Sequence, residues 1–174
     1  ERLAFYARRF ATVELNNSFY QLPARKQLER WRDIAGDGFV FAVKASRYIT
    51  HMKKLKDPEE SLDRFLGRVE TLGSALGPIL FQLPPRWHRD PGRLAAFLRQ
   101  LPDEHRYAFE FRDRSWHVGE IHAALRGAGA AFCIYDLAGE VSPKEITADF
   151  VYVRLHGPDG PYQGSYDAQA LAGW

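Results

Sequence analysis

Alternation of large apolar residues with small or polar ones is clearest in the segment 107–113, which reads Tyr-Ala-Phe-Glu-Phe-Arg-Asp. With the period of two that a strand has, its aromatic residues fall on one face, and Ala108, Glu110 and Arg112 fall on the other. A parallel strand buried on both sides would be apolar on both faces. The pattern therefore predicts a strand that packs its aromatic face against helices and ends in a polar site on the other face.

Five further segments show related patterns and are predicted to be strands: 12–16, 39–46, 78–83, 131–136 and 150–156. Helical patterns lie between and before them, at 1–10, 24–35, 58–72, 91–101 and 119–126. Strands that alternate with helices of about 10 to 15 residues indicate right-handed βαβ units and a parallel sheet.

The predicted strands share one large apolar face and a second face that is small or mixed and becomes polar at the C-terminal end. The residues at these ends are Glu14, Asn16, Lys44, Ser46, Gln82, Glu110, Arg112, Asp136, Arg154 and His156. A central strand of an open α/β sheet is covered by helices on both sides, so both of its faces should be apolar. In a (β/α) barrel, by contrast, inward residues at the C-terminal rim line the site. The pattern therefore favours an α/β protein with a TIM-type (β/α) barrel of parallel strands.

The predicted barrel is incomplete. Six strands are too few to close an eight-stranded barrel, and helical patterns begin or stop abruptly at both ends of the chain. We expect one strand to be lacking before Glu1 and one after Trp174. No linker or shift in composition divides the chain, so residues 1–174 are predicted to form a single barrel domain that is incomplete at both ends.

Composition narrows the class of protein. Hydrophobic residues make up 45% and charged residues 26%, as in soluble globular proteins. No segment approaches the roughly 20 apolar residues of a membrane span, so no membrane partner is expected. The single cysteine, Cys133, favours a reducing compartment and a cytoplasmic location. Because it alternates with Asp136, we expect Cys133 to point outward into the helix layer as inert core.

Several segments together resemble a known family. They are Val13–Tyr20, Phe41–His51, Leu80–Pro85, Phe109–Arg112 with Ser115-Trp116, and Tyr152–Gly157. In this order, along nearly the whole chain, they are similar to the YecE-like family of uncharacterised TIM barrels. The family usually begins with a Gly-Thr-Ser-Gly-Trp-type strand and ends with an aromatic-Asn-Asn segment, and neither is present here. The resemblance implies the fold and a shared rim of polar residues, and it implies no established reaction.

The polar rim suggests an anion site with an acid–base pair. Arg112 and Arg154 are of the type that holds a phosphate or carboxylate in bidentate fashion. Glu110 or His156 could move a proton, and Lys44 could stabilise developing charge or act as a nucleophile if its pKa is lowered. The fourth and fifth predicted strands should be neighbours, so Asp136 is expected near Glu110 and is a further catalytic candidate. The remaining ligand-binding candidates are Glu14, Asn16 and Gln82. The alternative is an ion-pair network that only stabilises the fold.

The loop after the last strand is a weaker candidate for phosphate binding. TIM barrels often bind phosphate after their seventh strand, at a helix N-terminus. If one strand precedes the six predicted here, the last predicted strand is the seventh of the barrel. Gly164 and Ser165 precede a predicted helix start near Asp167. An ordinary turn that caps a helix explains the same residues equally well.

Other classes of function fit less well. Glu14, Glu110, Asp136 and His156 are metal-ligand types, but Lys44, Arg112 and Arg154 on the same face would repel a cation, so neither a metal nor a cofactor is predicted. A basic loop at 47–57, with Lys53 and Lys54, could contact a nucleic-acid backbone, although a solvated charge run is commoner. We rank a metal-independent enzyme first, with a hydrolase or a lyase as the candidate classes. A non-catalytic protein that binds an anion ranks second. A barrel that processes nucleic acid, with or without a metal, ranks third. The sequence indicates no oligomeric state.

Overall fold

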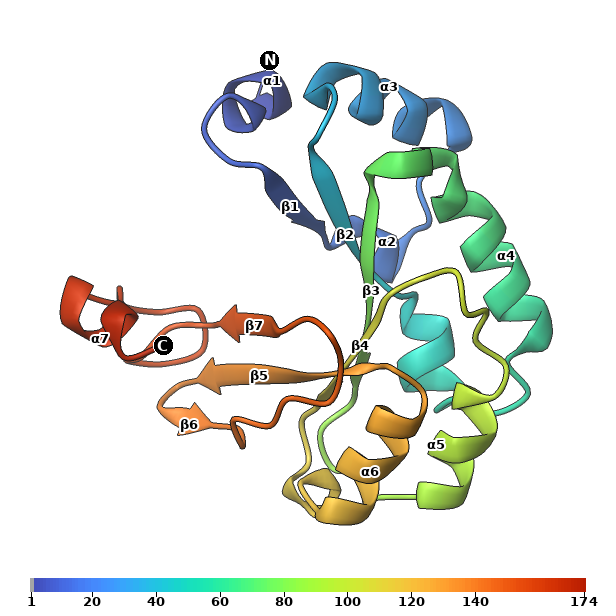
Figure 1. Ribbon diagram of the computed structural model, residues 1–174, viewed down its shortest axis with the longest axis vertical. Helices are drawn as coiled ribbons and strands as arrows, with labels where there is room; N and C mark the ends of the chain where they lie inside the picture. The colour runs from blue at the N-terminus through green and yellow to red at the C-terminus, as the bar shows by residue number, and fades with distance from the viewer. Residues whose placement is uncertain (1) are drawn as a thin grey trace.

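The computed structural model describes residues 2–174 and shows a curled sheet with helices on its convex side (Figure 1). The strands are β1 (Thr12–Leu15), β2 (Val40–Lys44), β3 (Leu76–Leu83), β4 (Tyr107–Phe111), β5 (Ala131–Leu137), β6 (Glu140–Val141) and β7 (Tyr152–Leu155). The α-helices are α1 (Arg2–Ala7), α2 (Asn17–Tyr20), α3 (Arg25–Ala35), α4 (Glu59–Val69), α5 (Pro91–Leu98), α6 (Gly119–Gly127) and α7 (Ala168–Ala172). Three shorter helical segments are η1 (Tyr48–Met52), η2 (Glu70–Ala75) and η3 (Arg114–Trp116).

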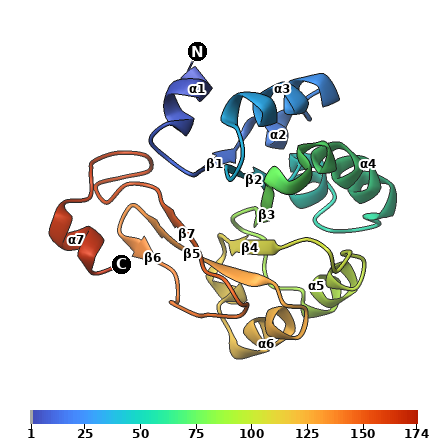
Figure 2. The same cartoon turned by 45° about the horizontal axis from the view of Figure 1, so that its top comes forward.

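Within the described residues, all pairs of strands except one are parallel. The order β1-β2-β3-β4-β5-β7 follows the chain, and each strand pairs with the next in parallel. The view in Figure 2 shows these strands following an arc rather than a flat layer. The result is a mixed α/β fold with a half-barrel sheet, which confirms the predicted βαβ pattern and matches part of a TIM-type barrel.

The exception is β6, which the sequence did not predict. It pairs antiparallel with β5 through a tight turn in which Ala138 and Gly139 both have positive φ, 56° and 78°. Such a two-residue turn matches the twist of a hairpin. Because β6 has only two residues, it is too short to show an alternation in the sequence.

The convex side of the sheet holds the larger core. Phe41, Phe81, Phe109, Phe111 and Phe132 are fully buried there against the helices. This confirms the aromatic outer face predicted for β4. Helices cover this side because each crossover between parallel strands returns over the same face of the curled sheet.

The concave side holds a smaller cluster of mostly small residues, and it corrects one prediction. The cluster consists of Ala42, Leu80, Ala108, Ala131, Cys133 and Tyr152. Cys133 therefore points inward, and the prediction that it faces the helices was wrong. Phe132 and Ile134, which alternate with it, occupy the outer core instead, because their larger apolar surfaces pack against the helices.

The segment after β2 also differs from the predicted loop. Residues Tyr48–Met52 form a π-helix, and three non-glycine residues that follow it, Lys54, Leu55 and Asp57, have positive φ of 49°, 63° and 42°. A π-helical turn is rare and frequently occurs at a functional site. Left-handed conformations are also unfavourable for residues that carry a Cβ, so the surrounding structure must hold this segment in place.

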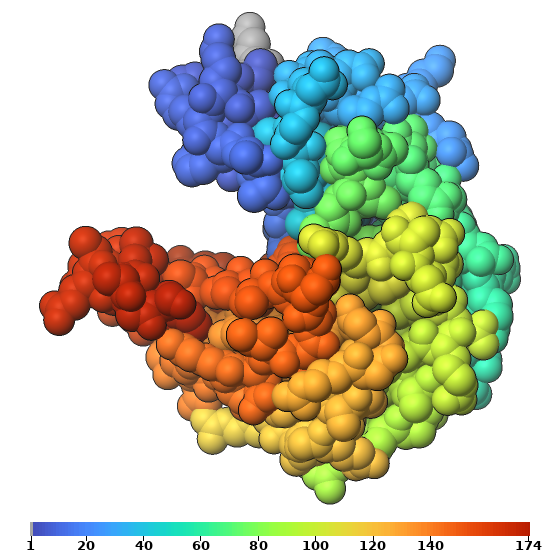
Figure 3. All heavy atoms as spheres, viewed as in Figure 1, coloured from blue at the N-terminus to red at the C-terminus, as the bar shows by residue number. Residues whose placement is uncertain are grey.

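The two ends of the arc face one another across a notch. Figure 3 shows the notch between the blue N-terminal segment and the orange-to-red C-terminal segment. Within residues 2–174, β1 pairs only with β2, and β7 pairs only with β5. In the same part of the chain, no helix is both long enough and apolar enough to cross a bilayer.

Gly77 in β3 provides a test of how closely β2 and β3 pack. A Cβ built there would lie 2.3 Å from Cγ1 of Val40 and 3.3 Å from the carbonyl oxygen of Phe41. We expect Gly77→Ala to lower the free energy of unfolding by about 1–3 kcal/mol, because overpacking displaces neighbouring atoms. The measurement is urea denaturation.

Gly67→Ala is the matched control for this substitution. Gly67 lies within α4, and a Cβ there would meet no atom within 4 Å. This change should raise the free energy of unfolding by roughly 0.5–1 kcal/mol, because alanine loses less backbone entropy in a helix. Equal effects of the two substitutions would contradict the close approach of the strands at Gly77.

Candidate functional site

The centre of the candidate site is the carboxylate of Glu110 on β4. It lies on the concave side of the sheet and is fully buried. Both of its oxygens face arginines: Oε1 forms an ion pair with Nε of Arg112, and Oε2 accepts a hydrogen bond from Nη1 of Arg154. Burying a carboxylate is costly unless it is paired, so the two guanidinium groups offset the cost of burying Glu110.

Arg154 on β7 joins the two ends of the half-barrel. Its Nη2 donates to Oε1 of Glu14 on β1 at 2.7 Å, while its Nη1 holds Glu110. The hydroxyl of Tyr152 donates to the other oxygen of Glu14, also at 2.7 Å. Side chains about 140 positions apart in the chain are thus joined across the concave side, although their strands do not pair within residues 2–174.

Arg112 is enclosed by three different groups. Besides its ion pair with Glu110, its Nη2 lies 2.9 Å from Nε2 of His156. Its guanidinium carbon also lies 4.9 Å from the centre of the Tyr135 ring, a cation–π distance. Because an arginine has only N–H donors, this contact requires Nε2 of His156 to be the unprotonated nitrogen that accepts.

Lys44, at the end of β2, differs from the two arginines. Its ammonium lies 4.1 Å from the centre of the Phe19 ring, and it forms no ion pair with any carboxylate in residues 2–174. The side chain is partly exposed. Lys44 is therefore the cation of the rim whose charge no direct partner neutralises.

Burial and the local excess of positive charge shift the pKa values of these groups. Burial, with Arg154 and Arg112 acting in the same direction, lowers the pKa of Lys44 to about 8, although Glu110 and Glu14 act to raise it. Burial also lowers the pKa of His156 to about 4, with Arg154 and Arg112 acting in the same direction, so its imidazole is neutral at pH 7. Burial disfavours the charge on Arg154, but the two carboxylates outweigh it and raise the pKa of this residue.

A hollow of about 510 Å³ lies beside Arg112 at this end of the sheet. Its lining includes Gln82, Arg112, Arg114, His117, Tyr135 and Tyr162. Tyr162 stacks edge-on with His156, with ring centres 5.4 Å apart, and so connects the hollow to the charged network. A volume of this size suits a small molecule.

Five predicted site residues come together in one network, and two more lie at its edge. Glu14, Glu110, Arg112, Arg154 and His156 form the network. Lys44 stands beside them, within electrostatic reach of Arg154 and both glutamates. Gln82 lies opposite Glu110 in the sheet register and lines the hollow with Arg112.

The other four predicted residues lie elsewhere. Asn16 is exposed at the start of α2. Asp136 accepts a hydrogen bond from the backbone of Gly139 at 3.1 Å, so it supports the β5–β6 turn. The expectation that it joins Glu110 is corrected because Tyr135, not Asp136, has the inward position on β5.

Gly164 and Ser165 are both exposed and take no part in the network. The N-terminus of α7 is capped by the carboxylate of Asp167, which accepts from the backbone of Ala170. A Cβ at Gly164 would also meet the carboxylate of Asp159 at 2.2 Å. Two carboxylates therefore lie where the sequence predicted phosphate, and they make this loop unfavourable for an anion.

Four residues of the site were not predicted from the sequence as site members. Tyr152 shares the alternation of Arg154 and His156, so the period of two could have identified it. Tyr135 could not be identified in this way, because either face of β5 could be the inner one. Phe19 and His51 come from the helical segments after β1 and β2, and their rings meet edge-on at 5.0 Å.

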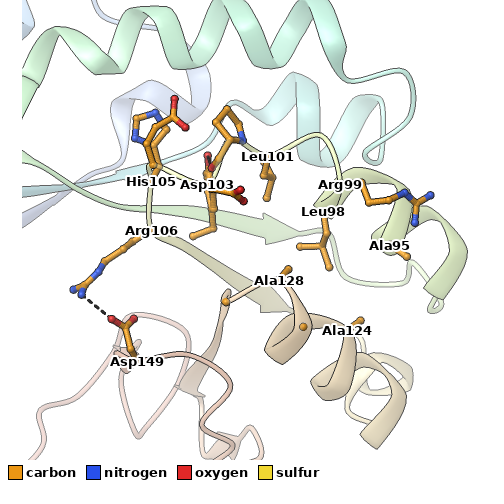
Figure 4. Close-up of a pocket in the computed structure, with 15 residues that line it drawn as sticks. Ala95, Leu98, Arg99, Leu101, Asp103, His105, Arg106, Ala124, Ala128 and Asp149 are labelled. Atoms are coloured by element: carbon orange, nitrogen blue, oxygen red, sulfur yellow. Dashed lines mark hydrogen bonds and ion pairs between the residues drawn. The ribbon is translucent and has the colours of Figure 1, made fainter.

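A larger hollow, of about 700 Å³, lies at the opposite end of the strands. Figure 4 shows it between the loop before β4 and the end of α6, with an ion pair between Arg106 and Asp149 at one side. Both partners of this pair are largely exposed. In barrels of this type the N-terminal end of the strands serves stability, and chemistry takes place at the C-terminal end, so we place the candidate site at the rim.

Fold and site together define the class: an α/β protein with a parallel half-barrel sheet and a buried charged network at the C-terminal ends of its strands. The chain belongs to the DUF72 family, whose model, described as a protein of unknown function, matches residues 1–174. This confirms the resemblance found in the sequence.

Curated relatives include the UPF0759 protein YecE of Escherichia coli (strain K12), which is 35% identical over 62% of this chain and 40% of its own length. The UPF0759 protein YunF of Bacillus subtilis (strain 168) is 32% identical over 67% of this chain and 44% of its own length. The chain thus spans less than half the length of these relatives.

Solved structures of DUF72 proteins have the same fold. One from Enterococcus faecalis V583 has a TM-score of 0.77 at 19% identity and covers 98% of this chain and 77% of its own. One from Thermotoga maritima MSB8 has a TM-score of 0.73 at 27% identity and covers 92% of this chain and 65% of its own.

Proposed function

We propose that the C-terminal rim binds a small molecule with a phosphate or carboxylate group and acts on it without a metal. The observation that carries this proposal is the surplus of positive charge in a partly enclosed site. Three cations, Lys44, Arg112 and Arg154, stand against two carboxylates, Glu14 and Glu110, and His156 is neutral at pH 7. An anion would remove the surplus, and low polarity around the site would strengthen the attraction.

The half-barrel sheet is, we infer, the larger part of a TIM-type (β/α) barrel. The strand order, the outer helices and the concave cluster of small residues support this inference. In such barrels the C-terminal rim is where substrates bind.

Lys44 is the best candidate for the residue that attracts the anion. Arg154 already donates to two carboxylates, and Arg112 is shared between Glu110 and His156. These two arginines therefore act first as a frame that holds the charges in place. Arg112 also lines the hollow, where an anionic group could approach its exposed edge. Glu110 has both oxygens occupied, so its role in this proposal is to position the arginines.

The same pairs argue against the metal-dependent alternative. Glu14 and Glu110 would have to release Arg154 before either could bind a cation, and Lys44 would remain nearby. The nucleic-acid alternative would depend on exposed lysines such as Lys54, which lie outside the network. The metal alternative would break the ion pairs of the network and the nucleic-acid alternative would leave the network unused, so we rank both below the small-anion proposal.

The test is a thermal-shift titration with phosphate, sulfate, acetate and a panel of sugar phosphates. A ligand of the folded state raises stability with concentration, by about 2.7 kcal/mol at a hundredfold excess over its Kd. We expect a saturable shift that is lost in Lys44→Met.

Lys56→Met is the matched control, because the Lys56 side chain is largely exposed and its one ion pair within residues 2–174 is with the exposed Asp57. It should keep the full shift. No saturable shift in the unsubstituted chain, or equal shifts in both variants, would refute an anion site at Lys44. Oligonucleotides at low salt form a separate arm, in which binding that depends on Lys53 and Lys54 would favour the nucleic-acid alternative.

A further inference from the structure

We propose that the amine of Lys44 is a reacting group that forms an imine with an aldehyde or ketone carrying an anionic substituent. This inference rests on the proposed function and names the substrate class of the same site. Lys44 is the last residue of β2, and its side chain lies on the concave side of the sheet beside the charged network. The side chain is partly open to solvent. A lysine that serves only stability would more commonly be paired with a carboxylate or extend into water.

The surroundings of Lys44 hold its amine in place. The side chain lies over the face of the Phe19 ring, at 4.1 Å from the ring centre. The backbone of Lys44 is also fixed, because its carbonyl accepts a hydrogen bond of 2.6 Å from the hydroxyl of the buried Ser18. An amine with a fixed backbone and a preferred direction has less freedom to lose when it reacts.

Burial, more than the charged groups around it, favours the neutral form of Lys44. Arg154 on β7 and Arg112 on β4 act against its positive charge, while Glu110 on β4 and Glu14 on β1 favour it, and burial tips the balance. On η1, the His51 ring meets the edge of the same Phe19 ring that Lys44 covers. Burial, Lys44 and Arg47 lower the pKa of His51 to about 4, so that His51 adds no second positive charge at pH 7.

A pKa of about 8 gives Lys44 a free amine near neutral pH. At pH 7.5 about a quarter of such amines are uncharged, against about 0.1% for an ordinary lysine of pKa about 10.4. The fraction that can react is therefore roughly 200-fold larger. Only the neutral amine has the lone pair that attacks a carbonyl carbon.

The step itself is balanced within the two reactants. The amine nitrogen attacks the carbonyl carbon and forms a C–N bond, giving a carbinolamine. The carbonyl oxygen then leaves as water with the two hydrogens of the amine, and a C=N bond remains. The neutral imidazole of His51 is the nearby group that can carry a proton between nitrogen and oxygen. The anionic substituent of the carbonyl compound would occupy the positive surroundings of Arg112.

The experiment is reductive trapping with borohydride. The chain is incubated at pH 7.5 with glyoxylate or glycolaldehyde phosphate, reduced, and examined by intact mass and peptide mapping. We expect one adduct per chain, located at Lys44, at least about tenfold more abundant than adducts at Lys53, Lys54 or Lys56. Acetaldehyde, which has no anionic group, should label Lys44 several-fold less, and inorganic phosphate should compete with glyoxylate.

Lys44→Arg separates this inference from the proposed function. Arginine keeps the positive charge but has no nucleophilic amine at this pH, so the phosphate thermal shift should persist while trapping is lost. Lys54→Arg, at an exposed lysine of the segment after β2, should keep both.

The outcomes are distinguishable. A phosphate shift with labelling of Lys44 no stronger than that of Lys53, Lys54 or Lys56 would overturn the imine and leave the anion site standing. Absence of the phosphate shift in the unsubstituted chain would count against the proposed function itself. If acetaldehyde labels Lys44 as strongly as glyoxylate does, the requirement for an anionic substituent is overturned.

Discussion

Glu110→Gln is expected to lower the free energy of unfolding by about 3–5 kcal/mol, the loss typical of breaking a buried ion pair. Glutamine has the same shape as glutamate but no charge, and Glu110 is fully buried. The substitution would leave Arg112 and Arg154 facing one another across a neutral amide, with only Glu14 to offset two positive charges. The cost arises from the unpaired buried charges and not from a change in volume.

Chemical denaturation measures this effect directly. At roughly 2–4 °C of melting temperature per kcal/mol for a chain of this size, the same change should appear as a fall of about 6–20 °C. Glu29→Gln is the matched control, because Glu29 is exposed on α3 and its substitution should stay within about 0.5 kcal/mol.

A double-mutant cycle with Arg154→Met adds a specific readout. Residues of one ion-pair network are not additive, so the double variant should be more stable than the sum of the single effects predicts, by up to about 3 kcal/mol. A fall of less than about 1 kcal/mol for Glu110→Gln, or additive effects in the cycle, would show that water replaces the carboxylate without cost. Turnover, once an activity is found, should be measured on the folded fraction, since the variant affects stability as well as chemistry.

The second large effect is on the pH dependence of stability. His156 has a pKa of about 4 in the folded chain, against about 6.5 for an unperturbed histidine. Between these values the unfolded state binds more protons than the folded state, so the free energy of unfolding must fall as pH falls. For this one residue we expect a loss of about 2 kcal/mol between pH 7 and pH 5.

The cause of this loss is the position of His156 within the network. Its imidazole is buried and faces Arg112, Arg154 and Lys44, which oppose a further positive charge more strongly than Glu14 can favour it. Glu110 also faces it, with Oε1 at 3.8 Å from Nε2, and the Tyr162 ring covers one side. Protonation would also turn the nitrogen that accepts from Arg112 into a donor, so two donors would then face each other.

His156→Gln tests this dependence. Glutamine can still accept a hydrogen bond from Arg112 through its side-chain oxygen, but it does not titrate. Between pH 7 and pH 5 the free energy of unfolding of the variant should therefore fall by about 2 kcal/mol less than that of the unsubstituted chain. His51, whose pKa is also about 4, still lowers the free energy of unfolding of the variant as pH falls. His88→Gln is the control, because the His88 side chain is 88% exposed. An unchanged slope in His156→Gln would mean that His156 is not held neutral by the network.

Much of the fold could be predicted from alternation alone. The aromatic residues of β4 were assigned to the helix side, and Glu110 and Arg112 to the other, because a strand directs successive side chains to opposite faces. The same rule placed Arg154 and His156 together on β7, and it would have included Tyr152. On β5 the rule left the choice open: Cys133 and Tyr135 alternate with Ile134 and Asp136, and both sets contain one apolar and one polar group.

Local sequence also could not predict the segment after β2. A π-helix followed by Lys54, Leu55 and Asp57 in left-handed conformations goes against local preference, so only surrounding packing can hold it. It matters for function because this segment carries His51 to the Phe19 ring. The loop at Gly164 shows the opposite case, since glycine and serine before a helix suggested phosphate, while Asp159 and Asp167 occupy the space in the fold.

The sequence by itself determined the six strands of the parallel sheet, the apolar face of β4 and the family, because these depend on short-range periodicity and on motifs read along the chain. Only the tertiary structure decided that Glu14 and Arg154 meet across the concave side, that Arg154 and Arg112 share one buried carboxylate, and that Lys44 forms no ion pair with a carboxylate of residues 2–174. The reason is physical. Pairing between charges depends on distance and burial, and both are set by how the ends of the curled sheet approach one another rather than by spacing in the chain.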